Sequence, residues 1–174
     1  TVPELKQIVI AIDPAVTANE ESNETGIIVC GIDEQDHGYT LEDASSIYHP
    51  NEWALKAIQL YDKYKASYIV AEVNQGGDLV TNTIKQVAKS LGKSHIPIKS
   101  VRATKGKYTR AEPIGALYEQ GKIHHVGNFA TLEDQLCTYL PGDDISPDRL
   151  DALVWAYYFL LVKQVETQEH ESLW

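Results

Sequence analysis

The chain has 174 residues and a formal net charge of −10 at pH 7, with 43% hydrophobic and 23% charged residues. This composition is typical of a folded domain, and it excludes a collagen, a coiled coil and a disordered tail. The longest apolar run (152–162) is too short to cross a bilayer. Cys30 and Cys137 share no ligand spacing and are expected to be buried free thiols.

The first half of the chain is predicted to form three strands, a helix and a fourth strand. Short β-branched runs separated by polar turn residues predict the strands, and their short connections indicate an antiparallel meander. Apolar residues at helical spacing follow the helix breaker His49-Pro50. The expected elements are strands at 7–13, 25–33 and 39–48, a helix at 51–65 and a strand at 67–73.

The second half alternates helices and strands. Gly92 ends one expected helix, and Pro113 is expected to break another. Such alternation predicts an α/β fold in which the fourth and fifth strands join the sheet by right-handed crossovers. The expected elements are helices at 78–91, 108–120, 128–140 and 148–163, a strand at 95–101, a basic loop at 102–107, a short strand or connection at 122–126 and a loop at 141–147. Residues 1–163 would be one domain, with a polar tail at 164–174.

Three carboxylates stand beside apolar runs, where a lone acid is costly unless it is paired or bound to a metal. Asp13 ends the first strand, Glu72 lies in the fourth, and Asp151 begins the last helix. A strand-end cap, a helix cap or a salt bridge would explain any one of them. If all three converge, their repulsion calls for a divalent cation, and oxygen ligands without His or Cys suit Mg²⁺ or Mn²⁺.

Two such ions about 3.5–4 Å apart can hold the attacking and leaving oxygens of a phosphodiester displacement. Asp13 is the candidate bridging ligand, because it ends a strand expected to be central and rigid. Asp148 lies three residues before Asp151, on the same helical face, and is a candidate for a further ligand.

The positive charge is concentrated in one segment. The basic segment, Lys85–Arg110, carries eight Lys or Arg and no Asp or Glu, whereas the other 148 residues carry 7 basic and all 25 acidic side chains. A solvated helix face followed by a loop would explain this pattern, and so would a surface that contacts a polyanion. Together with the acids, the second interpretation favours a nuclease.

Five stretches carry a family resemblance: IAIDPA (10–15), TGIIVCGID (25–33), IVAEVNQGG (69–77), KGKYTRAEPIGALYEQGKIHHV (105–126) and SPDRLDALVWA (146–156). Over residues 7 to 163 the chain resembles the C-terminal nuclease domain of the large terminase subunit of tailed bacteriophages and prophages. The resemblance implies a ribonuclease H-like fold. It also implies that Asp13, Glu72 and Asp151 are the catalytic, metal-binding acids, whereas the role of Asp148 is left open.

The same resemblance suggests where DNA would bind. Lys105, Lys107 and Arg110 match the family's basic stretch, and Asn74 precedes a Gly76-Gly77 turn that either shapes a substrate groove or simply connects strand to helix. With the neighbouring cations of the basic segment, the expected DNA-binding residues are Lys99, Arg102, Lys105, Lys107, Arg110 and Asn74. His124 and His125 are expected to be structural, with proton transfer as the alternative.

The expected activity is metal-dependent cleavage of double-stranded DNA concatemers during viral genome packaging, with two Mg²⁺ or Mn²⁺ ions. The alternatives are a ribonuclease H-like junction resolvase or hybrid nuclease, and a non-catalytic domain that docks on DNA or a portal. The sequence contains no Walker A loop and no Met. The resemblance therefore implies an ATPase domain before Thr1, with the portal and the small terminase subunit as further partners. It also implies the cytoplasm of an infected or lysogenic bacterium and no membrane.

Overall fold

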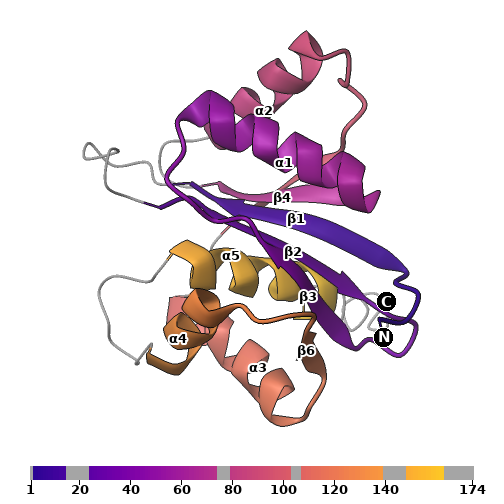
Figure 1. Cartoon of the computed structure of the whole chain (residues 1–174), viewed down its shortest axis with the longest axis vertical. Coiled ribbons are helices and arrows are strands. Elements are labelled where there is room, and N and C mark those ends of the chain that lie inside the picture. Colours follow the sequence, from indigo (N-terminus) through magenta and orange to yellow (C-terminus); the bar gives the residue numbers. More distant parts are fainter. Residues whose placement is uncertain (1, 15–23, 74–78, 103–106, 139–147, 163–174) are drawn as a thin grey trace, which may run out of the picture.

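The computed structural model describes residues 2–14, 24–73, 79–102, 107–138 and 148–162. Its centre is one six-stranded mixed sheet with the order β5-β4-β1-β2-β3-β6 (Figure 1). The strands are β1 (Gln7–Asp13), β2 (Gly26–Ile32), β3 (Gly38–Asp43), β4 (Tyr68–Val73), β5 (Ile98–Arg102) and β6 (Ile123–His125).

The predicted strand directions are confirmed. β1, β2 and β3 form an antiparallel meander, whereas β4 joins β1 in parallel and β5 joins β4 in parallel. β6, expected as a short strand or a connection, pairs in parallel with β3 and forms the other edge of the sheet. Because β1, β4 and β5 are parallel, their carboxyl ends lie at one end of the sheet.

Two strand boundaries differ from the prediction by more than one residue, both for local reasons. β3 ends at Asp43 instead of residue 48, because the Asp43 carboxylate accepts a hydrogen bond from the Ser45 backbone N–H at 3.0 Å and begins a turn. β5 starts at Ile98 instead of residue 95, just after Pro97, which has no N–H to donate to a neighbouring strand.

Helices cover both faces of the sheet (Figure 1). On one face lie α1 (Pro50–Tyr64) and α2 (Leu79–Ser90); on the other lies α5 (Asp148–Tyr157), with α3 (Lys107–Glu119) and α4 (Ala130–Thr138) beyond it. Alternate residues of β1 therefore enter separate cores, with Ile10 and Ile12 facing α1 and α2, and Val9 and Ala11 facing α5. All seven residues of β2 are buried, as expected for a central strand covered on both sides.

Two helix predictions are corrected. The expected break at Pro113 is absent: α3 continues through it, and the burial of the next residue, Ile114, offsets the one backbone hydrogen bond that a proline removes. The last helix, predicted as continuous to residue 163, becomes a π-helical turn, η1 (Tyr158–Val162). Among the described residues, no helix is long and apolar enough to span a membrane.

Candidate metal centre

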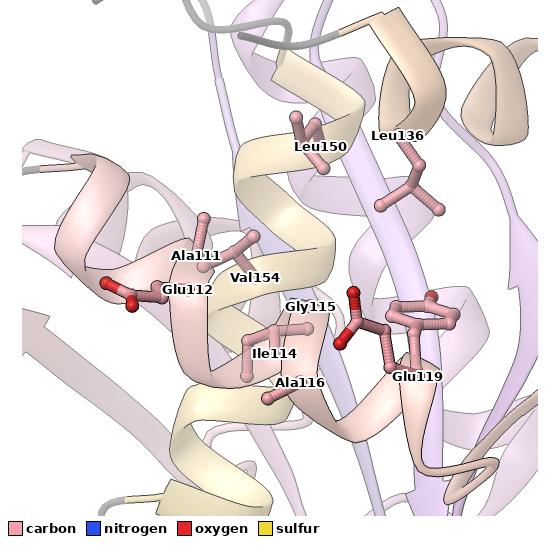
Figure 2. A pocket seen from close by; sticks show the side chains of 10 residues that line it. Ala111, Glu112, Ile114, Gly115, Ala116, Glu119, Leu136, Leu150 and Val154 are labelled. Carbon is pink, nitrogen blue, oxygen red and sulfur yellow. The ribbon is translucent and has the colours of Figure 1, made fainter. Parts of the chain in front are cut away.

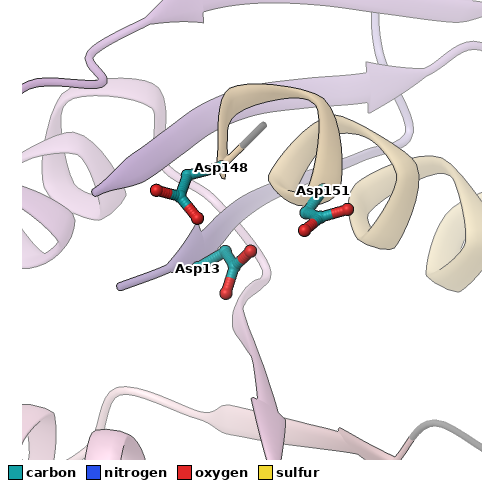
Figure 3. Close-up of side chains that lie close together, drawn as sticks. All are labelled: Asp13, Asp148 and Asp151. Atoms are coloured by element: carbon teal, nitrogen blue, oxygen red, sulfur yellow. The ribbon is translucent and has the colours of Figure 1, made fainter. Parts of the chain in front are cut away.

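The structure brings three aspartates together at one end of the sheet. Asp13 is the last residue of β1, while Asp148 and Asp151 lie in the first turn of α5 (Figure 3). One carboxylate oxygen from each lies within 4.8 Å of the other two. In the described part of the chain, no other group of three metal-ligating side chains is gathered this closely. We call Asp13, Asp148 and Asp151 the acidic cluster.

The close approach of α5 to the sheet explains why these residues meet. Gly26 is the first residue of β2 and the register partner of Asp13. A Cβ atom at position 26 would lie only 2.1 Å from the backbone oxygen of Asp148. The first turn of α5 thus rests directly on the backbone of β2, at the level of Asp13, and only glycine leaves room for it.

The chemistry of the acidic cluster suits a hard divalent cation. Asp151 is 8% exposed and the other two residues are half-buried, so water screens their repulsion less than it would on an open surface. The amino-terminal end of α5 favours negative charge but offsets only part of that repulsion. Three carboxylates without His or Cys form a donor set that fits Mg²⁺ or Mn²⁺.

Glu72, the other expected ligand, lies at the same end of the sheet but outside the acidic cluster. The pairing of Ile12 with Ala71 puts Glu72 level with Asp13 on the neighbouring strand. Its Oε2 accepts a hydrogen bond from Trp155 Nε1 at 3.1 Å, and Trp155 lies one helical turn after Asp151 on α5. Glu72 is therefore bound to the helix that carries two of the three clustered acids.

The expected DNA-binding residues have different surroundings. Arg110 is only 5% exposed, and its guanidinium carbon lies 4.4 Å from the centroid of the Trp155 ring. Lys99 and Arg102 are exposed on the edge strand β5, with Lys99 Nζ 5.1 Å from the centroid of the Tyr68 ring. Outside the described residues lie Asn74, Lys105 and the side chain of Lys107.

The two histidines lie at the opposite edge of the sheet, on β6. His124 Nε2 is 3.1 Å from His37 Nδ1. His125 connects α3 to α4: its Nε2 is 2.7 Å from the Tyr118 hydroxyl, and its Nδ1 is 3.2 Å from Glu133 Oε1. Neither histidine belongs to the acidic cluster.

A separate hollow of about 400 Å³ lies between α3, α4 and α5 (Figure 2). Its lining is mainly apolar, with Glu112 and Glu119 as charged members, and it contains none of the expected site residues. Cys137 lines an adjacent hollow of about 460 Å³. Cys137 is exposed, so the expectation of two buried thiols is wrong for this residue and correct for Cys30.

Sequence reasoning missed three residues that position the site: Gly26, Arg149 and Trp155. Arg149 stands between Asp148 and Asp151 and forms ion pairs with Glu24 and Asp43. The sequence did offer a signal for Arg149, because this cation stands between the candidate ligands Asp148 and Asp151 in the D-R-x-D stretch. No local pattern reveals the contacts of Gly26 or Trp155, since each partner is distant in the chain.

A comparison with protein families gives a match over most of the chain. The family model described as the Terminase RNaseH-like domain matches residues 10–159. A search of curated proteins found no match.

Three solved structures share the fold. The large terminase nuclease of thermophilic phage G20c with bound zinc has a TM-score of 0.61 and 18% identity, covering 87% of this chain and 80% of that chain. The nuclease domain of the large terminase subunit gp2 of bacterial virus Sf6, in a mutant form with manganese and beta-thujaplicinol, has a TM-score of 0.58 and 13% identity, covering 86% of this chain and 87% of that chain. The yeast mitochondrial Holliday junction resolvase Ydc2 has a TM-score of 0.56 and 11% identity, covering 87% of this chain and 77% of that chain. At these identities the likeness establishes the ribonuclease H-like fold alone.

Proposed function

Because the chain belongs to the terminase RNaseH-like domain family, we propose that it is a metal-dependent endonuclease that hydrolyses phosphodiester bonds of double-stranded DNA. The observation that carries this proposal is the acidic cluster, whose three carboxylates come within 4.8 Å of one another at the end of the sheet. Family membership supports a nuclease, and the cluster supports the dependence on metal.

Asp13, Asp148 and Asp151 would hold two Mg²⁺ or Mn²⁺ ions, with Glu72 as the further candidate ligand. When bound, two such ions activate the attacking water and stabilise the charge on the leaving 3′ oxygen. Asp13 would be the ligand shared by the two ions; in support, β1 is hydrogen-bonded on both sides, to β2 and to β4, and so holds Asp13 rigidly. Trp155 holds the Glu72 carboxylate through its indole N–H, and Arg110 lies over the indole ring.

The exposed cations of β5 would bind the DNA backbone. Arg102 is paired with Val73, next to Glu72, so it lies at the metal end of the sheet, and Lys99 is farther along the same edge strand. Lys105, Lys107 and Asn74 remain proposed DNA contacts from the resemblance. For Arg110, burial over Trp155 favours holding that ring in place over direct contact with phosphate.

The biological substrate would be concatemeric viral DNA during genome packaging. We propose that the domain acts beside an ATPase domain of the same protein, with the portal and the small terminase subunit as partners. The place of action would be the cytoplasm of an infected or lysogenic bacterium.

A second candidate activity is the resolution of four-way DNA junctions. The likeness to the yeast resolvase favours it, because the same fold occurs in that enzyme. Side-by-side assays on linear duplex, four-way junction and RNA–DNA hybrid distinguish the candidates. A strong preference for the junction or the hybrid would overturn the proposed duplex endonuclease.

The decisive test is cleavage of supercoiled plasmid DNA with Mn²⁺ or Mg²⁺. We expect Asp13→Asn and Asp151→Asn to abolish nicking and linearisation while the circular dichroism spectrum is unchanged. Asp134→Asn, on the exposed surface of α4, is the matched control and should cleave normally. Undiminished cleavage by either cluster variant would contradict the assignment. If calorimetry finds no Mn²⁺ binding to the wild type, the non-catalytic docking domain is favoured instead.

A further inference from the structure

Arg149 connects the start of α5 to the end of β3 and to Glu24, two residues before β2. Its Nε and Nη2 each donate to a Glu24 carboxylate oxygen at 3.1 Å, and its Nη1 donates to Asp43 Oδ2 at 2.6 Å. The Arg149 side chain is 15% exposed and that of Asp43 is 6% exposed. The hydrogen bonds to Glu24, helped by the one to Asp43, outweigh burial and raise the pKa of Arg149 above its ordinary value. Paired, charge-assisted bonds of this kind define direction as well as distance.

The two partners of Arg149 belong to the framework that carries Asp13. Glu24 lies two residues before Gly26, the register partner of Asp13, while Asp43 ends β3 and pairs with Ile28 of β2. The other oxygen of Asp43 accepts a hydrogen bond from the Ser45 backbone N–H at 3.0 Å, which orients the carboxylate. Arg149 stands between Asp148 and Asp151. It therefore ties the first turn of α5, which carries these two acids, to residues close to Asp13.

At Gly26, the backbone of β2 limits how far α5 can move toward the sheet. Since the backbone oxygen of Asp148 would be 2.1 Å from a Cβ at position 26, the helix lies closer to β2 than any side chain at this position would allow. The Arg149 ion pairs oppose movement away from the sheet. Repulsion among the three cluster carboxylates would drive such movement whenever no cation neutralises them.

We propose that Arg149 is a positioning residue that preorganises the acidic cluster for divalent cations. Its ion pairs with Glu24 and Asp43 hold Asp148 and Asp151 at binding distance from Asp13 before the metal arrives. Part of the free energy of metal binding is then not spent on drawing α5 toward β1. This inference rests on the proposed function, because it assumes that the cluster binds metal.

The test is a Mn²⁺ titration of the full chain, followed by calorimetry and by the electron paramagnetic resonance spectrum of bound Mn²⁺. We expect Arg149→Met to weaken Mn²⁺ binding by about 10-fold or more, the range typical of residues that orient metal ligands. The spectrum of the remaining bound ion should change. Arg149→Lys keeps the charge but not the paired geometry, and should fall between the wild type and Arg149→Met.

The matched control is Lys63→Met, which removes another helix-to-β3 ion pair, Lys63–Glu42 at 2.7 Å, on the opposite face of the sheet. It should leave Mn²⁺ affinity unchanged. Glu24→Gln is a second, milder test: it keeps the shape, removes one partner charge, and should weaken Mn²⁺ binding even if Arg149→Met does not fold.

Three results would contradict the proposal in distinguishable ways. If the wild type binds Mn²⁺ and the folded Arg149 and Glu24 variants bind it equally well, the positioning role is wrong while the proposed function stands. If the wild type binds no Mn²⁺, both are wrong. A loss of thermal stability without a change in Mn²⁺ affinity or spectrum also contradicts the proposal, because it reduces Arg149 to a structural residue.

Discussion

Two neighbouring acids at the end of β3 bind cations from helices on opposite faces of the sheet. Glu42 accepts hydrogen bonds from Lys63 Nζ at 2.7 Å and from the Tyr64 hydroxyl at 2.6 Å, both on α1. Asp43 accepts from Arg149 of α5 at 2.6 Å. The alternation of side chains along a strand sends these neighbours in opposite directions. The two ion pairs therefore join the same strand to two different helices.

The pairs differ in their exposure and in what they hold. The Lys63 side chain is 61% exposed, whereas that of Arg149 is 15% exposed. Exposed ion pairs contribute little to stability, because water and side-chain entropy offset the attraction. Near the acidic cluster, in contrast, the guanidinium makes three hydrogen bonds to two carboxylates, of which Asp43 is 6% exposed and Glu24 is 38% exposed. The comparison teaches that what an ion pair contributes depends on its burial and on the residues beside it: the exposed Lys63–Glu42 pair adds little stability, whereas the less exposed Arg149–Asp43 pair fixes α5 beside the acidic cluster.

The largest effect on stability is expected at Gly26, where α5 approaches the sheet. Gly26→Ala should lower the free energy of unfolding by about 3 kcal/mol, the upper end of the usual cost of overpacking, because the obstructing atom is backbone. Mn²⁺ affinity should fall with it. Urea unfolding and calorimetry measure the two effects.

Gly115→Ala on α3 is the control for that substitution. Apart from the neighbouring residues and the backbone of α3 itself, no atom lies within 4 Å of a Cβ at this position, so alanine should stabilise the helix by about 0.5–1 kcal/mol. A Gly26→Ala protein as stable as the wild type would show that α5 can move off β2 without cost.

Arg149→Met should have the next largest effect on stability. Removing the guanidinium leaves Asp43 shielded from water without its charged donor, and we expect a loss of about 2 kcal/mol in the free energy of unfolding. Chemical unfolding of the metal-free protein isolates this loss from metal binding. An unchanged unfolding midpoint would mean that the Arg149 ion pairs contribute no more than the exposed pair on α1.

Lys63→Met should lower the free energy of unfolding by less than about 1 kcal/mol, as is usual for an exposed ion pair. Plasmid cleavage and Mn²⁺ affinity should be unchanged. A destabilisation equal to that of Arg149→Met, measured in the same urea titration, would remove the contrast between the two faces.

The smallest effect concerns the pH dependence of the Glu42 pair. Burial acts to raise the pKa of Glu42, but hydrogen bonds from Lys63 and Tyr64 outweigh it and hold the pKa below its ordinary value. A carboxyl group with a depressed pKa in the folded state stabilises the protein above its unfolded pKa, and this stabilisation is lost as the pH falls through the folded pKa. The stability difference between the wild type and Lys63→Met should therefore shrink on acidification. A difference that grows with falling pH would contradict this sign.

Much of the site was predictable at the level of elements. Apolar runs and turn residues predicted β1 and the start of α5, and they also predicted that Asp13 and Asp151 stand at the ends of these elements. Asp148 was predicted only as a further ligand, yet it lies in the acidic cluster, whereas Glu72 lies outside it. Whether a carboxylate joins such a cluster depends on how α5 is rotated and seated on the sheet, and the periodicity of one helix carries no information on this.

Charge, in contrast, was a poor guide to exposure. Lys99, Arg102 and Arg110 of the basic segment were all expected to contact DNA, but Arg110 is buried over Trp155 while Lys99 and Arg102 are exposed. A guanidinium is weakly hydrated and stacks on aromatic rings, so an arginine in a basic run can be withdrawn from water when a partner ring from another element is at hand.

The sequence by itself determined the order and type of most helices and strands, the mixed α/β class and which acids stand at the ends of elements. These features follow from local periodicity, turn chemistry and the cost of burying lone charges. Only the tertiary structure decided that Gly26 admits α5, that Arg149 ties α5 to Glu24 and to Asp43 of β3, and that Trp155 holds Glu72. Each of these contacts joins residues far apart in the chain, and its distance and direction arise only when the helices pack on the sheet.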